Sequence, residues 1–316
     1  SVLQFNYDGY CINILDTPGH QDFSEDTYRT LMAADSAVMV IDASKGVEAQ
    51  TRKLFKVCVM RHIPIFTFIN KMDREARDTF ELLDDIEKEL GIATCPVNWP
   101  IGSGKAFKGV YDRAKKEVEL FSDTKKGTAM GEVQMVPIDA PETEELIGAD
   151  AKKILADEIE LLDGASAEFD QELVDKGQLS PVFFGSALTN FGVETFLKHF
   201  LKMTTSPLPR KSDHGEIDPM TEKDFSAFVF KIQANMNKAH RDRIAFMRIC
   251  SGEFEAGMSV YHVQGGKDVR LSQPQQMMAS ERKMIDKAYG GDIIGIFDPG
   301  IFSIGDTLTT SKEKFA

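Results

Sequence analysis

The sequence is short of positive charge, of cysteine and of long apolar runs. Its 316 residues carry 37 Lys and Arg against 50 Asp and Glu, a net charge of -13. A protein that grips nucleic acid by bulk attraction normally presents a basic surface, so any nucleic-acid contact must be local. The four cysteines are widely scattered, without a CxxC pair or a histidine at metal-ligand spacing. We therefore expect reduced core thiols rather than disulfides or a metal site.

No apolar run approaches the roughly 18 residues that a membrane span requires, and no signal peptide opens the chain. We expect a cytoplasmic protein without a membrane partner. With 42% hydrophobic and 28% charged residues, the chain is ordinary globular material, long enough for two domains. Ser1 is not a methionine, and residues 1–5 already have the pattern of a strand that pairs with residues 10–15 across a turn at Asp8-Gly9. The chain is expected to start inside a domain.

The first motif is Asp16-Thr17-Pro18-Gly19-His20, which follows an apolar run at residues 10–15 that predicts a buried strand. A helix is predicted to begin near Asp22, which is the geometry that holds ligands at the carboxyl ends of parallel strands. Asp16 can hold Mg²⁺ through water, the Gly19 amide can approach a terminal phosphate closely, and His20 can orient an attacking water. For these five residues alone, an ordinary strand-to-helix turn is the alternative.

Strands and helices alternate along the first 203 residues. Helical spacing predicts helices, and continuous apolar runs predict buried strands, at residues 23–34 (helix), 36–42 (strand), 48–60 (helix), 63–69 (strand), 78–90 (helix), 95–101 (strand), 181–185 (strand) and 192–203 (helix). This alternation is typical of an α/β fold with a doubly wound parallel sheet.

The second motif, Asn70-Lys71-Met72-Asp73, follows the predicted strand at residues 63–69. Guanine offers two adjacent donors, N1-H and the exocyclic amine, and the carboxylate of Asp73 can accept both, whereas adenine offers no such pair. Asn70 would brace the loop and read the purine, and the alkyl stem of Lys71 would cover the ring face. An isolated NKxD occurs by chance in loops. After a buried strand and downstream of the first motif, it predicts a guanine site.

Residues 106–163 interrupt the alternation with a predicted hairpin and a helix, which indicates a small inserted subdomain. The alternation then resumes with a strand that ends in Ser186-Ala187-Leu188, where backbone amides can meet the guanine O6. The stretch from Gly102 to Lys105 is not a phosphate-binding loop, because Trp99 stands where the first glycine is required and Ala106 replaces the Ser or Thr that binds Mg²⁺.

The second half of the chain no longer alternates strands with helices. Residues 204–224, with three prolines and mixed charge, predict a linker. Short strands separated by Gly-rich turns then predict an antiparallel β-barrel over residues 225–316. The best local basic patch precedes one of these strands, and either an rRNA contact or a solvated loop explains its members, Lys238, His240, Arg241 and Arg243.

The three motifs in this order, with Ala256-Gly257 and the string at residues 243–252 in the barrel, resemble the translational GTPases. Within that class the chain resembles the bacterial GTPase release factors, the release factor three family, through the strings at residues 23–31, 98–102, 228–235 and 240–243. The likeness covers essentially all 316 residues.

The resemblance implies a monomeric GTP hydrolase that binds GTP or GDP with Mg²⁺, with a GTP-binding domain at residues 1–203 and a barrel domain at residues 225–316. It implies the ribosome as a partner, through ribosomal proteins and the rRNA of the GTPase-activating region. It also implies class I peptide chain release factors as partners, whose departure at translation termination the family promotes.

The sequence departs from that family in one respect. The family's phosphate-binding loop and first switch segment lie upstream of the position of Ser1, and its C-terminal α+β domain lies beyond residue 316. We therefore expect an internal fragment that is inactive alone. Two alternatives stay open: another translational GTPase, such as an elongation factor G-like translocase or a ribosomal protection protein, and a ribosome-binding module that does not hydrolyse GTP.

Overall fold

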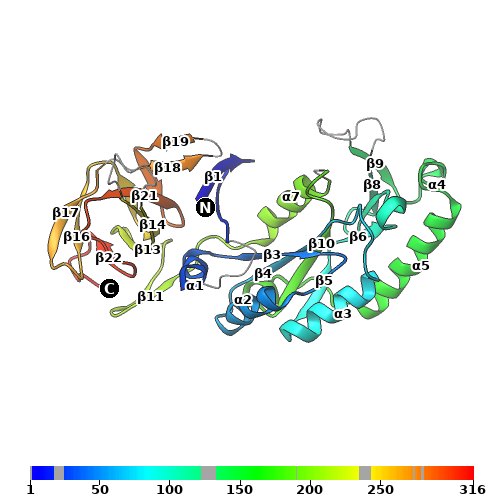
Figure 1. The fold of residues 1–316 in the computed structure, drawn as a ribbon, viewed down its shortest axis with the longest axis horizontal. Coiled ribbons are helices and arrows are strands. Elements are labelled where there is room, and N and C mark those ends of the chain that lie inside the picture. Colours follow the sequence, from blue (N-terminus) through cyan, green and yellow to red (C-terminus); the bar gives the residue numbers. More distant parts are fainter. Residues whose placement is uncertain are drawn as a thin grey trace. The chain divides into compact units, whose positions relative to one another are not determined.

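The computed structural model describes residues 2–17, 25–121, 133–189, 191–234, 243–272, 275–278 and 281–316. They form two compact units (Figure 1). The parallel-sheet unit comprises Ser36–Thr204, and the curled-sheet unit comprises Ser1–Asp35 together with Thr205–Ala316. The division after the first domain lies one residue from the expected 203. Residues 1–35, however, group with the second half of the chain instead of with the predicted GTP-binding domain.

The parallel-sheet unit contains a four-stranded parallel sheet in the order β3-β4-β10-β5. The strands are β3 (Ala37–Asp42), β4 (Ile65–Asn70), β10 (Leu179–Phe184) and β5 (Ala93–Pro96). Two helices lie on one side of the sheet and one on the other: α2 (Ala49–Met60) with α3 (Thr79–Leu90), and α7 (Val193–Met203) (Figure 1). The predicted alternation and parallel pairing are confirmed for these elements.

Helix α7 covers its side of the sheet through aromatic rings. Phe196 of α7 contacts Phe68 and Phe183 edge to face, at centroid distances of 5.5 and 4.9 Å. Strand β3 lies at the edge of this sheet, where Val38 and Val40 stand in register with Phe66 and Phe68. Val38 is 40% and Val40 58% exposed. The predicted strand at residues 36–42 is confirmed, but its continuous burial is not, since Ala37, Met39 and Ile41 are buried and the valines between them are exposed.

The inserted subdomain begins earlier than expected, at residue 98 instead of 106. The predicted strand at residues 95–101 is two strands, because Asn98–Ile101 leaves the parallel sheet and pairs antiparallel with the next strand along the chain. The subdomain has a four-stranded antiparallel sheet and two helices: β6 (Asn98–Ile101), β7 (Gly109–Asp112), β8 (Glu117–Phe121), β9 (Val133–Pro137), α4 (Pro141–Ile147) and α5 (Ala149–Ala165). A turn η1 (Gly104–Ala106) joins β6 to β7, and α6 (Gln171–Asp175) leads back to β10.

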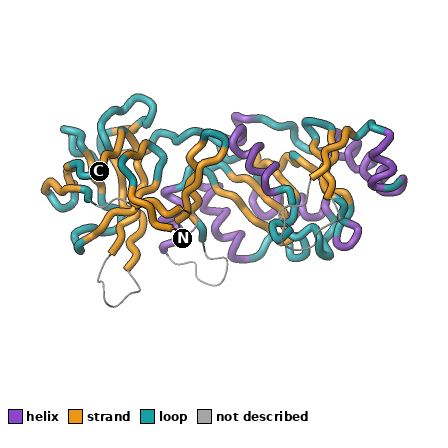
Figure 2. The backbone as a smooth tube through the Cα atoms, turned by 90° about the horizontal axis from the view of Figure 1, so that it is seen from above, coloured by secondary structure: helices purple, strands orange, loops and turns teal. Residues whose placement is uncertain are grey.

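The curled-sheet unit is built almost entirely of strands (Figure 2). Its main sheet has the order β17-β16-β22-β13-β14-β21-β18-β1-β2, with β19 on β18. The sheet curls around one apolar core, to which Phe225, Val229, Met247 and Ile294 belong. The strands are β1 (Val2–Tyr7), β2 (Tyr10–Leu15), β13 (Ser226–Ala234), β14 (Arg243–Ser251), β16 (Ser259–His262), β17 (Lys267–Arg270), β18 (Gln275–Met278), β19 (Glu281–Met284), β21 (Ile293–Asp298) and β22 (Thr307–Thr309).

Two further antiparallel pairs of short strands accompany this sheet. One lies in the segment predicted to be a plain linker, which contains β11 (Arg210–Ser212) and β12 (Gly215–Ile217). The other pairs β15 (Glu253–Glu255) with β20 (Lys287–Tyr289). The antiparallel character of the second domain is confirmed, and the linker is more structured than its composition indicated.

Strand β2 does not join the parallel sheet, which corrects the sequence-based expectation. The hairpin itself is confirmed, since β1 and β2 pair antiparallel from Val2↔Leu15 to Tyr7↔Tyr10. Strand β1 in turn pairs with β18, and Asn13 donates to Asp292 at 3.3 Å. Because β2 forms the edge of this sheet, it is not a buried strand, and Tyr10 is 53% exposed.

The cysteines follow the expectation with one exception. Cys58, Cys95 and Cys250 are buried free thiols, whereas Cys11 is a free thiol on the exposed edge strand β2. Burial raises the pKa of the Cys58 thiol to about 12, so this group stays protonated. In the described ranges no helix has the length and apolar character to cross a membrane.

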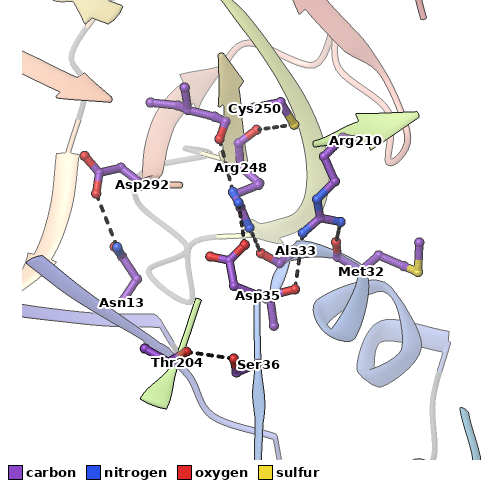
Figure 3. Close-up of polar contacts among 12 residues, drawn as sticks. Asn13, Met32, Ala33, Asp35, Ser36, Thr204, Arg210, Arg248, Cys250 and Asp292 are labelled. Atoms are coloured by element: carbon purple, nitrogen blue, oxygen red, sulfur yellow. Dashed lines mark hydrogen bonds and ion pairs between the residues drawn. The ribbon is translucent and has the colours of Figure 1, made fainter. Parts of the chain in front are cut away.

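The helix that follows the first motif, α1 (Glu25–Ala33), ends against two arginines of its own unit (Figure 3). Its last turn holds no basic residue, and the last carbonyls of a helix have no partner within it. Arg210 donates to the carbonyls of Met32 and Ala34, and Arg248 donates to the carbonyl of Ala33. Arg248 also pairs with Asp35 at 2.8 Å and is only 1% exposed. The negative end of α1 is thus neutralised by side chains from β11 and β14.

We expect Arg248→Met to destabilise the curled-sheet unit by about 3 kcal/mol, since it removes the buried partner of the ion pair with Asp35 and the donor to the carbonyl of Ala33. The free energy of unfolding is measured by urea denaturation, and a second experiment measures the rate of amide hydrogen exchange in α1. Arg270→Met is the matched control, because Arg270 is exposed and donates to the carbonyl of Gly257 at 3.1 Å. The double variant Arg248→Met/Asp35→Asn should recover part of the loss. Equal stability of Arg248→Met and Arg270→Met would contradict this account.

Candidate functional site

Two neighbouring parallel strands deliver the second and third motifs to one edge of the parallel sheet. Strand β4 ends at Asn70 and β10 ends at Phe184, with Ile69 and Phe184 in register. Because the strands are parallel, the residues that follow them meet. The hydroxyl of Ser186 donates to Oδ1 of Asp73 at 2.8 Å, and the amide of Ala187 donates to Oδ1 of Asn70 at 2.8 Å. The structure thus brings together two motifs more than a hundred residues apart.

Backbone contacts fix the two loops to each other. The amide of Met72 donates to the carbonyl of Gly185 at 3.2 Å, and the amide of Gly185 donates to Ile69 at 3.0 Å. A Cβ at Gly185 would lie 2.6 Å from the carbonyl oxygen of Phe191, so only glycine fits this crossing. Lys71 adopts a left-handed backbone with φ of 67°, which costs about 1 to 2 kcal/mol for a residue with a side chain. The surrounding bonds hold this strained turn in place.

Lys71 is anchored by an aspartate that sequence reasoning did not single out. Its ammonium lies 3.0 Å from Oδ2 of Asp42, the last residue of β3, which stands in register with Asn70. Burial raises the pKa of Asp42, but hydrogen bonds from Ser44 and Lys71 outweigh that effect and lower the pKa to about 2. Asp42 is therefore a permanent anion at neutral pH. The ring-covering role of the Lys71 stem stays a prediction.

The carboxylate of Asp73 is held by one hydrogen bond from the neighbouring loop. Ser186, which is 1% exposed, uses its hydroxyl to hold Oδ1 of the half-buried Asp73. A carboxylate has about four acceptor positions, so both oxygens can still accept hydrogen bonds from a base. Asn70 uses its side-chain oxygen on Ala187, which directs its amide group toward donation.

The amides expected at the guanine O6 are engaged within the protein. The amide of Ser186 donates to the carbonyl of Phe191 at 3.0 Å, and that of Ala187 donates to Asn70. A base oxygen at this place would share the Ala187 amide with Asn70 or take it over. The Leu188 side chain is 79% exposed.

The first motif falls in the curled-sheet unit. Asp16 and Thr17 follow β2 directly, and Pro18, Gly19 and His20 lie outside the described residues. Within the described part of the chain, no three His, Cys, Asp or Glu side chains group as ligands for a metal ion. A single carboxylate such as that of Asp16 fits Mg²⁺ that keeps several waters and is bound mainly by phosphate oxygens. The roles of Asp16, Thr17, Pro18, Gly19 and His20 stay predictions.

The basic patch of the second half is only partly described. Lys238, His240 and Arg241 lie outside the described residues, whereas Arg243 begins β14, with its Nε 3.9 Å from Oδ2 of the buried Asp298. Asp298 also accepts backbone hydrogen bonds from Gly300 and Ile301. Arg243 therefore has a structural partner, and the choice between an rRNA contact and a solvated loop stays open.

Comparison with known proteins gives two family matches and close relatives. The elongation factor Tu GTP binding domain matches residues 1–206, and elongation factor G domain 2 matches residues 224–311. A peptide chain release factor 3 from Symbiobacterium thermophilum is 61% identical over 312 residues, covering 99% of this chain and 59% of the relative. One from Trichormus variabilis is 55% identical over 313 residues, covering 99% and 58%. The chain thus spans less than two thirds of these relatives' length.

A solved structure from Thermus thermophilus shares the fold. It aligns with a TM-score of 0.74 at 22% identity, over 98% of this chain and 46% of that one. At this identity the likeness concerns the fold alone. It agrees with the α/β unit followed by an antiparallel curled sheet.

Proposed function

This chain belongs to the family of elongation factor Tu GTP-binding domains, and from that membership we propose that its intact protein is a ribosome-dependent GTPase of translation termination. It hydrolyses GTP to GDP and phosphate and promotes the departure of class I peptide chain release factors from the ribosome. The names of the relatives, peptide chain release factor 3 at 61% and 55% identity, support termination over other steps of translation. We place this activity in the cytoplasm, with a monomeric protein.

The observation that carries the nucleotide assignment is the held carboxylate of Asp73. Ser186 fixes one of its oxygens at 2.8 Å, and Asn70 braces the facing loop. In the proposed complex Asp73 accepts N1-H and the exocyclic amine of guanine, Asn70 donates to the purine, and Lys71 covers the ring. In the Ser186-Ala187-Leu188 turn, the Ala187 amide serves the guanine O6 together with the Leu188 amide, while the Ser186 amide keeps its bond to the carbonyl of Phe191.

The hydrolytic step is assigned to the first motif. Asp16 would hold Mg²⁺ through water, and the ion would neutralise charge on the phosphates. The Gly19 amide approaches the terminal phosphate, with Thr17 and Pro18 shaping the turn. His20 orients the attacking water. These are proposals from the sequence and the family.

The test is an assay of the full-length protein on ribosomes that carry a class I release factor. We expect GTP hydrolysis to be stimulated by ribosomes and to accompany release-factor departure. The same preparation is tested for translocation with elongation factor G as the reference. Translocation without release-factor departure would favour the elongation factor G-like alternative. Ribosome binding without hydrolysis would favour a non-hydrolysing module.

A further inference from the structure

Asn98, the first residue of β6, is bonded to the end of strand β10. Its side chain is 2% exposed. Oδ1 accepts from the amide of Phe184 at 2.7 Å, and Nδ2 donates to the carbonyl of the same residue at 3.3 Å. The side-chain amide of asparagine has a carbonyl acceptor and N-H donors, so it can pair with a peptide N-H and a peptide C=O at once. Asn98 therefore serves Phe184 as a neighbouring strand would.

Phe184 needs this partner because its neighbouring strand has departed. Strand β5 pairs with β10 only as far as Pro96, opposite Val182, and the amide of Val97 makes the last strand-like bond to Val182 at 2.8 Å. Beyond that point the chain turns into the inserted subdomain. Without the Asn98 side chain, a buried N-H and a buried C=O at the end of β10 would lose their partners on this side.

The neighbouring residue ties the same strand end to a helix of the inserted subdomain. Trp99 is fully buried, and its ring stands edge to face on Phe184 at 5.4 Å. Its indole N-H donates to Glu158 of α5. The inserted subdomain thus holds Phe184 through both its backbone and its ring.

A second contact reaches the other loop of the guanine site. The amide of Gly104, in η1, donates at 2.9 Å to the carbonyl of Met72, which lies between Lys71 and Asp73. Phe184 precedes Ser186 by two residues, and Ser186 holds Asp73. We call the two segments that follow β4, as far as Asp73, and β10, as far as Ser186, the base-reading loops. The inserted subdomain contacts residues in or beside both of them.

We propose that the inserted subdomain, residues 98–165, is a positioning element for base recognition and that Asn98 is its principal positioning residue. The inference rests on the proposed function, in which Asp73 reads guanine. Asn98 holds the end of β10 in place, and the position of β10 sets the position of the Ser186 hydroxyl. That hydroxyl orients the Asp73 carboxylate through its hydrogen bond. Asn98 touches no nucleotide itself.

The test compares GDP with inosine diphosphate on the full-length protein. Inosine lacks the exocyclic amine, and inosine diphosphate carries the same phosphates as GDP. The dissociation constant of inosine diphosphate divided by that of GDP therefore reports recognition of the base, because the contribution of the phosphates cancels. We expect Asn98→Leu to weaken GDP binding about tenfold, equivalent to one poorly made charge-assisted hydrogen bond, and to lower the ratio by a similar factor. Asn98→Ala, whose small side chain cannot clash, should behave alike.

Ser180→Ala is the matched control. Ser180 lies on β10 and shares a buried hydrogen bond of 2.8 Å with Thr67, at the end of the strand away from the loops. It should lower the melting temperature without changing the ratio. An unchanged ratio in Asn98→Leu and Asn98→Ala would overturn the inference alone. Equal binding of GDP and inosine diphosphate by the wild-type protein would overturn the proposed guanine reading, and this inference with it.

Discussion

Asp73→Asn should invert the base preference of the intact protein from guanine to xanthine. Xanthine carries a carbonyl where guanine has the exocyclic amine, so the Asp73 carboxylate repels it, whereas an asparagine can donate to that carbonyl. Hydrogen bonds to a charged group contribute about 1.5 to 3 kcal/mol each, so GDP affinity should fall by about a hundredfold or more. Competition between GDP and xanthosine diphosphate for the variant measures the inversion.

The geometry makes this substitution cleaner than most. Ser186 donates its hydroxyl to Oδ1 of Asp73, and an asparagine can keep that oxygen in place, so the loop should not rearrange. Asp84→Asn makes the same charge change at an exposed position of α3 and should leave both affinities unchanged. A variant that keeps its GDP preference would show that Asp73 is not the base reader.

The hydrophobic pattern of the sequence predicted the elements whose structure depends mainly on residues nearby in the chain. Strands β4 and β10 and helices α2, α3 and α7 have strong periodicity, and the structure places them within a few residues of the prediction. The base-reading loops were found because they follow buried strands, and parallel pairing of β4 with β10 then brings Asp73 to Ser186. Here sequence position and strand direction suffice.

The misses have a common physical cause, which is pairing between distant segments. The run at residues 10–15 has the composition of a buried strand, yet β2 lies at an edge because β1 pairs with β18. The roles of Asn98 and Asp42 were also missed. The Asn98 side chain bonds the backbone of Phe184, and Asp42 stands in register with Asn70, so each role depends on a distant segment. Asp42 had a usable signal, because it ends a strand of the sheet as Asn70 does. Asn98 opens the string at residues 98–102 that carries part of the family resemblance, but a polar residue in an apolar stretch has many explanations, so its role could not be predicted.

His20→Ala should abolish most ribosome-stimulated GTP hydrolysis while leaving nucleotide binding nearly intact. His20 follows the glycine whose amide is proposed to meet the terminal phosphate, so its side chain can reach the water in line with the leaving oxygen. An interaction made only in the transition state changes the rate and not ground-state affinity. We expect turnover to fall by roughly a thousandfold or more, with GTP and GDP affinities within a few-fold of wild type. Single-turnover hydrolysis on ribosomes measures it.

The alternative role for His20 is to cap the helix that the sequence predicts to begin near Asp22. A cap would contribute up to about 2 kcal/mol of stability and would not affect GTP hydrolysis. A melting curve beside the kinetic assay separates the two, because a cap predicts a lowered melting temperature with normal hydrolysis. His20→Gln should retain more hydrolysis than His20→Ala, since an amide can also orient water. His214→Ala is the control, because His214 is an exposed histidine bonded to Asp213. Normal hydrolysis by His20→Ala would leave the water without a positioning residue in this motif.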